Sequence, residues 1–213
     1  MMKTLWQTLA PIAILLFLFS CKNEDLTIVD SKSSVLRDTI LIYKGDSTFI
    51  RNEDITISFN RVISDSRCPI GVECVRAGEV TGEFRYTKGS FSVIFNATNG
   101  YSVFVDGYSV KLIDVLPYPR ITNSVSPLYS AKIVVAKPLH TLIKGTAKNY
   151  TGLDGCGFVV ELDNGSKLEP INCSFGFKNN QRVALFYNVL YGVMTTCMVG
   201  QPAHIDEIYE LVE

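Results

Sequence analysis

The sequence predicts an all-β protein in two parts, an immunoglobulin-like β-sandwich followed by a small five-stranded β-barrel. Short runs rich in Val, Ile, Tyr and Phe recur along the chain and are separated by turn residues. No stretch carries a long apolar repeat at the helical period of 3.6 residues. An apolar content of 47% and a charged content of 19% indicate a folded chain rather than a disordered one.

The first part is expected over residues 35–137. Residues 55–59 read Ile-Thr-Ile-Ser-Phe, the alternation typical of a half-buried strand. Asp106-Gly107 separates two such runs and predicts a tight hairpin. The expected strands are residues 40–43, 55–59, 80–86, 91–95, 101–105, 108–115 and 131–136. Seven or eight strands in about 100 residues indicate a sandwich.

The second part is expected over residues 138–213, after the boundary at Lys137-Pro138-Leu139. Its expected strands are residues 141–148, 158–162, 166–171, 182–189 and 204–211. Five strands in about 70 residues suit a small barrel, because closure removes the open edges that invite aggregation.

The turn at residues 163–165 has two alternative registers. A two-residue Asn-Gly turn would place Cys156 opposite Cys173 and permit a bridge between them. A three-residue loop, with Gly165 in the left-handed conformation, instead pairs Val160 with Leu168 and gathers the apolar side chains on one face. Burial of that face favours the three-residue loop, in which the two cysteines point to opposite faces.

Five cysteines remain besides Cys21, an odd number that leaves at least one thiol unpaired within the chain. Cys68 and Cys74 bracket a short segment and are expected to form a small disulfide loop. A zinc site there would need two further ligands, and both histidines lie far away in the sequence. The second expected bridge is Cys156–Cys197, which leaves Cys173 free and buried.

Residues 1–20 have the layout of an export signal, with Lys3 near the start and an apolar middle. The uninterrupted apolar stretch 9–19 is shorter than the roughly 20 residues that a membrane-spanning helix, the alternative, requires. Leu-Phe-Ser followed by Cys21 resembles the lipidation site of bacterial lipoproteins, although Phe19 departs from its usual small residue. We therefore expect a lipid anchor on Cys21 and a flexible tether over residues 21–34.

The expected location is the outer membrane, with the protein attached through its lipid anchor. Lys22-Asn23-Glu24-Asp25 resembles a short surface-export signal of some Gram-negative lipoproteins, and an ordinary solvated tether is the alternative. A formal net charge of −1 with no basic blocks argues against nucleic acid as a partner.

Two groups of motifs resemble known bacterial proteins. Residues 65–79, which contain Ser-Arg-Cys-Pro, Gly-Val, Cys-Val and Ala-Gly-Glu, together with Pro117-Tyr118-Pro119, resemble a family of small secreted domains. That family usually has Trp where this chain has Arg76. Residues 145–157, ending in Thr-Gly-Leu-Asp-Gly-Cys-Gly, with Leu-Glu-Pro at 168–170 and a late Cys197, resemble a module of envelope lipoproteins. The resemblance implies architecture and location, and no activity.

Motifs for catalysis, metal binding and cofactor binding are missing from the sequence, so no catalytic residue, metal ligand or cofactor is expected. Cys173 is expected to be a buried and inert thiol. The alternative is that it acts as a nucleophile with His140 or His204 as its base. Asp154 precedes Gly155 and is expected to form a turn rather than a cation site.

The leading functional hypothesis is a non-catalytic binding or structural module that contacts a protein or a glycan. Arg67, Arg76 and Tyr118 are the candidate contact residues, because a disulfide-braced loop loses little entropy on binding. An inhibitor of an envelope-attacking hydrolase is the second hypothesis, and a hydrolase with scattered carboxylates is the third. The sequence does not identify the ligand, the membrane face or the oligomeric state.

Overall fold

The computed structural model describes residues 33–121, 128–153 and 155–213 of the chain. All regular secondary structure in these residues is β, which confirms the predicted fold class. The strands are β1 (Ser33–Ser34), β2 (Thr39–Tyr43), β3 (Ser47–Ile50), β4 (Ile55–Asp65), β5 (Val80–Lys88), β6 (Phe91–Thr98), β7 (Ser102–Val105), β8 (Tyr108–Leu116), β9 (Ser130–Ala136), β10 (Ile143–Asn149), β11 (Phe158–Leu162), β12 (Lys167–Ile171), β13 (Gln181–Val189) and β14 (Gln201–Val212). The expected signal at residues 1–20, Cys21 and Asp154 lie outside the described residues.

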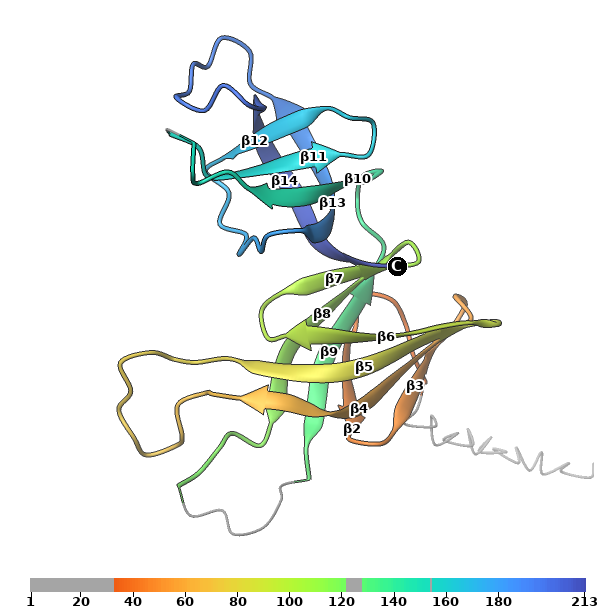
Figure 1. Cartoon of the computed structure of the whole chain (residues 1–213). Coiled ribbons are helices and arrows are strands. Elements are labelled where there is room, and N and C mark those ends of the chain that lie inside the picture. The colour runs from red at the N-terminus through yellow and green to blue at the C-terminus, as the bar shows by residue number, and fades with distance from the viewer. Residues whose placement is uncertain (1–32, 122–127, 154) are drawn as a thin grey trace, which may run out of the picture. The chain divides into compact units, whose positions relative to one another are not determined.

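The sandwich consists of two sheets (Figure 1). One has the strand order β1-β3-β4-β5-β6, and β7-β8-β9-β2 form the other. Alternating side chains of β4, β5, β8 and β9 are buried between them, as the period of two requires. The largest fully buried side chains of this core are Tyr86, Phe59, Phe84, Ile50, Ile55, Ile57, Leu112 and Ile133.

The predicted hairpin at Asp106-Gly107 is present. Val105 pairs directly with Tyr108, so the loop has two residues. The two loop residues, Asp106 and Gly107, have positive φ angles of 45° and 85°, as the type I′ turn requires.

The second part is a closed barrel with the strand order β12-β11-β10-β13-β14, and β12 also pairs with β14. Val160 pairs with Leu168, and Gly165 has a φ of +88°, which confirms the three-residue loop. The barrel core contains Val160, Leu162, Leu168, Val183, Leu185 and Ala203. Burial of this apolar face selects the register, as expected.

One long strand, β14, belongs to both parts. Its first residues close the barrel against β12 and β13, and its last residues pair in parallel with β7 of the sandwich. The sheet therefore runs without interruption from the barrel into the sandwich. The two buried clusters nevertheless contain no common residue. The predicted division at residues 137 and 138 stays a prediction.

Two strands were not predicted. β3 has only four residues, too few for a clear alternation, and follows the Lys-Gly-Asp turn directly. β1 has two residues and pairs in parallel with β3 at Phe49 and Ile50. Because β1 lies within residues 21–34, the end of the expected tether is part of the sheet.

Both expected disulfides are present, Cys68–Cys74 and Cys156–Cys197. Cys173 is free, as predicted. Its predicted burial is wrong, because the residue is only half-buried. It follows the end of β12, where the alternation of the strand gives way to an irregular segment.

Candidate functional site

The disulfide-braced segment extends the β4–β5 hairpin beyond its last paired residues. The Ser66 N–H donates to the Glu79 carbonyl at 2.8 Å, and the Cys68 N–H donates to the Ala77 carbonyl at 2.9 Å. The Cys68–Cys74 bridge then closes the end of the hairpin. The backbone of the loop is therefore fixed both by hydrogen bonds and by a covalent link.

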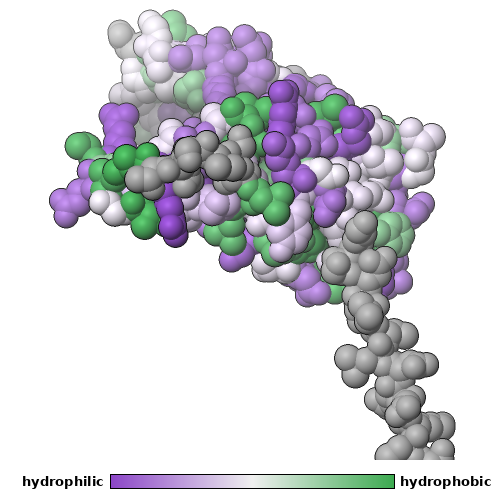
Figure 2. Space-filling model, turned by 90° about the horizontal axis from the view of Figure 1, so that it is seen from below, coloured by the Kyte–Doolittle hydropathy of each residue, from purple (hydrophilic) through white to green (hydrophobic). Residues whose placement is uncertain are grey.

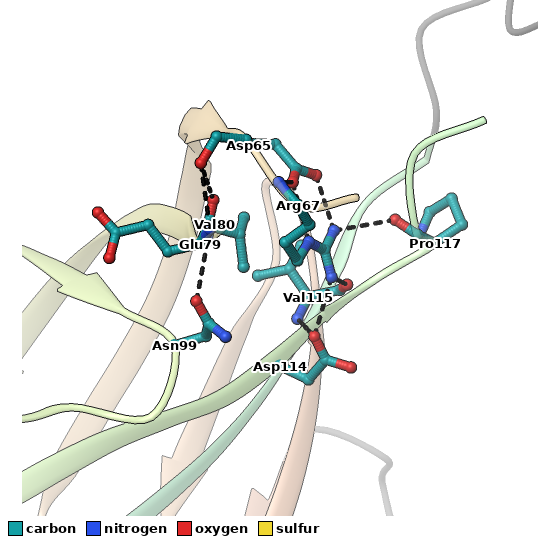
Figure 3. Close-up of polar contacts among 9 residues, drawn as sticks. Asp65, Arg67, Glu79, Val80, Asn99, Asp114, Val115 and Pro117 are labelled. Carbon is teal, nitrogen blue, oxygen red and sulfur yellow. Dashed lines mark hydrogen bonds and ion pairs between the residues drawn. The ribbon is translucent and has the colours of Figure 1, made fainter. Parts of the chain in front are cut away.

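Arg67 anchors this loop to the body of the sandwich (Figure 3). Its guanidinium makes two hydrogen bonds with the carboxylate of Asp65, at 2.9 and 2.7 Å. The remaining N–H groups donate to Asp114 at 2.9 Å and to the carbonyls of Val115 and Pro117. A guanidinium has five N–H donors, so every donor has an acceptor. Such complete pairing makes a buried cation tolerable.

The pKa of Arg67 reflects this pairing. Burial acts to lower it, but the hydrogen bonds and charge of Asp65, followed by the charge of Asp114, outweigh the burial and raise the pKa above its ordinary value. Arg67 thus stays cationic at any pH at which the protein is folded.

Two loops meet at this arginine. The ring of Tyr118 stacks on the guanidinium at 4.2 Å, which is a cation–π contact. Ile70 and Arg120 form an isolated parallel bridge, in which the Ile70 N–H donates to the Pro119 carbonyl at 2.9 Å. The peptide bond between Leu116 and Pro117 is cis. The Pro-Tyr-Pro segment and the disulfide loop therefore form one unit, called the braced tip here (residues 66–79 and 117–121).

The expected contact role of Arg67 is wrong. Its side chain is only 2% exposed and all of its donors are engaged, so it offers nothing to a partner. Tyr118 is partly exposed, with one face of its ring on Arg67. Arg76 is exposed and has no ion pair among the described residues. The candidate contact set therefore keeps Arg76 and Tyr118.

The braced tip exposes several apolar side chains among charged ones. Val75 is fully exposed, and Ile70, Val72 and Ile121 are also exposed to solvent. Figure 2 views the molecule from below, and apolar residues lie among hydrophilic ones on this face. Gathered exposed apolar side chains are typical of an interaction surface rather than of a free one. The residue types alone do not predict this surface, because the exposure of these side chains depends on the fold.

Neither expected histidine forms a pair with Cys173 among the described contacts. His140 stacks on Phe186 at 4.0 Å and pairs through Nδ1 with Glu207, on the side wall of the barrel. His204 Nε2 lies 3.7 Å from Asp206. The described residues also contain no group of three or more side chains placed to hold a metal ion.

Comparison with protein-family models, with curated proteins and with solved structures finds no match to this chain. The described part of the chain also contains no helix that could span a bilayer.

Proposed function

We propose that this chain is a lipid-anchored protein of the bacterial cell envelope that binds another protein through its braced tip, without catalysis. The observation that carries the proposal is an exposed apolar surface on a fixed backbone. Val72 and Val75 lie inside the loop that the disulfide closes, and Arg67 holds the base of that loop. Preorganisation of this kind lowers the entropy lost when a partner binds.

Two features support the proposed compartment. The layout of residues 1–20 and Cys21 is that of a lipoprotein signal. Two disulfides suit an oxidising location outside the cytoplasm. Mass spectrometry of the protein purified from its membrane fraction should show an N-terminal acylated cysteine. A Cys21→Ala variant that remains equally membrane-bound would contradict the anchor.

Binding through the tip is tested with two variants of matched character. Val75→Asp places a charge on the tip, and Leu139→Asp places one at an exposed apolar position outside it. Both side chains are solvent-exposed, so neither change should affect folding. We expect the full-length protein to cross-link to an envelope or secreted protein, and Val75→Asp alone to lose that partner. Equal retention by both variants would refute a binding role for the tip.

An inhibitor of an envelope-attacking hydrolase is the second candidate, because a rigid protruding loop can occupy an enzyme cleft. The same pair of variants separates this candidate from simple adhesion. An inhibitor would slow the hydrolysis of purified envelope by a lytic enzyme, and Val75→Asp would abolish the protection. Binding without any change in hydrolysis would exclude inhibition and leave the adhesive role.

A further inference from the structure

A groove with a volume of about 350 Å³ lies where the end of β14 pairs with β7, and Glu79, the last residue of the braced tip, is part of its lining. Strands β5 and β6 supply one side of its lining, and the irregular segment 175–178 after β12 supplies part of the other. Val103 of β7 is buried and lines the groove beneath these residues. A volume of this size falls at the lower end of the range for small-ligand sites, roughly 300–1,000 Å³.

Tyr101 provides an aromatic wall for this groove. The residue is 48% exposed, so much of its ring is available to a ligand. The Tyr101 hydroxyl lies 3.9 Å from the position that a Cβ atom would occupy at Gly176. The tyrosine therefore extends from the sandwich to the segment that follows β12. An exposed ring of this kind offers an apolar face and a polar hydroxyl together.

The remaining lining is rich in groups that both donate and accept hydrogen bonds. Thr81 and Thr98 are paired across β5 and β6, with their hydroxyl oxygens 2.9 Å apart. The amide side chain of Asn96 lies on the same lining and has no hydrogen-bond partner among the described residues. Hydroxyl and amide groups in this mixture match the hydroxyl groups of a sugar, which also donate and accept.

The charged groups of the groove are unpaired. Glu79, Lys178 and Glu210 line it, and none of the three forms an ion pair within the described part of the chain. Two carboxylates against one ammonium give the groove a net negative charge. This charge disfavours acidic sugars and phosphates, and it favours a ligand that carries an amino group.

We propose that this groove binds a short oligosaccharide of neutral or amino sugars. The apolar face of a sugar ring packs on Tyr101, its hydroxyl groups bond with the threonine hydroxyls and the Asn96 amide, and an amino group lies near Glu210. The site shares Glu79 with the base of the braced tip but none of the exposed apolar residues of the tip, and it does not depend on the protein partner proposed above.

The test is a calorimetric titration of the full-length, detergent-solubilised protein with three trisaccharides and one peptide. The probes are chitotriose with free amines, its fully N-acetylated form, trigalacturonate and trilysine. We expect chitotriose to bind best, the acetylated form to bind several-fold more weakly, and trigalacturonate and trilysine not to bind. Binding of trilysine with none of either chitotriose form would assign the groove to basic peptides and overturn the proposal.

Four variants test the position of the binding site and its independence from the tip. Tyr101→Ala should weaken the binding of both chitotriose forms at least tenfold. Tyr43→Ala, at an equally exposed tyrosine outside the groove, should leave the affinity for both forms unchanged. Glu210→Gln should remove the preference for the amine form and leave the acetylated form unchanged. Equal effects of the two tyrosine variants, or a lack of saccharide binding by the parent protein, would refute the proposal. A Val75→Asp variant that keeps saccharide binding would show that the groove and the tip are independent.

Discussion

The ring of Tyr118 lies 4.2 Å from the guanidinium carbon of Arg67, and this contact joins the Pro-Tyr-Pro segment to the end of the β4–β5 hairpin. The two motifs that are far apart in the sequence thus meet at one buried cation. The same arginine fixes the direction of the disulfide loop, because two of its five donors reach Asp65 on one side and the other three reach Asp114 and the carbonyls of Val115 and Pro117 on the other.

Removal of this cation should strongly destabilise the sandwich. Arg67→Met leaves the carboxylates of Asp65 and Asp114 close together without their partner, and loss of one member of a buried pair costs about 3–5 kcal/mol. The matched control is Arg61→Met, which breaks a pair whose arginine is 62% exposed, so its effect should be far smaller. Urea unfolding followed by circular dichroism measures both. Comparable losses would show that the Arg67 cluster does not hold the fold.

Gly78 is required for the close approach of the two backbone segments at the base of the tip, just beyond the ends of β4 and β5. A Cβ at this position would lie 1.9 Å from the Ser66 carbonyl oxygen, and the φ of +69° also disfavours any side chain. Gly71 has a φ of +87° but open space around it. Gly71→Ala should therefore cost only about 1–2 kcal/mol for the left-handed conformation, and Gly78→Ala clearly more. Thermal unfolding of both variants checks the order, and a reversed order would contradict the close approach.

The two disulfides should contribute unequally to stability. Cys156–Cys197 closes a sequence separation of 41 residues, and Cys68–Cys74 closes one of 6. In the loop-entropy model the first contributes about 4 kcal/mol and the second about 2 kcal/mol. Double alanine variants of each pair, compared by urea unfolding, should show this difference. A larger loss from the small loop would indicate that the tip governs global unfolding.

Tyr108 should make the protein less stable at alkaline pH. Its burial, followed by its hydrogen bond to Glu53, raises the pKa of Tyr108 to about 12. The unfolded tyrosine ionises near pH 10, so this contribution to stability is complete below pH 10 and is lost between pH 10 and about 12. Tyr108→Phe should flatten the decline of stability in that window. An unchanged slope in a pH series of unfolding curves would contradict the shift.

The same hydrogen bond acts in the opposite direction at acid pH. The Tyr108 hydroxyl, followed by Lys137, lowers the pKa of Glu53 below its ordinary value. A carboxylate with a lowered pKa stabilises the fold above its unfolded pKa, and this contribution disappears as the pH falls through the folded value. Glu53→Gln should therefore reduce the loss of stability on acidification below about pH 4.5. The measurement is the same pH series, extended to pH 2.

The local sequence pattern was sufficient to predict most strands, the Asp106-Gly107 hairpin and the register that pairs Val160 with Leu168. These features depend on alternation of side chains and on turn chemistry, which are properties of adjacent residues. The pairing of Cys156 with Cys197 followed from that register. The braced loop could also be predicted, because its cysteines lie close together in the chain.

The burial of Arg67 could not be predicted in this way. An arginine next to Ser66 and Cys68 has the character of a surface residue, and its acceptors at Asp114, Val115 and Pro117 lie on β8 and just beyond it. Only the packing of the two sheets brings these groups together. The contact role that was expected of Arg67 is therefore proposed for its exposed neighbours on the tip.

By itself, the sequence determined the all-β class, the order and approximate extent of most strands, and both disulfides, because each of these rests on local periodicity or on register. The tertiary structure decided which side chains are exposed and which elements meet. It paired β14 with β7, which formed the groove with Tyr101 and Glu210, and it buried Arg67 beneath Tyr118. These relationships join residues far apart in the chain, and their stability comes from burial and charge pairing that no local pattern records.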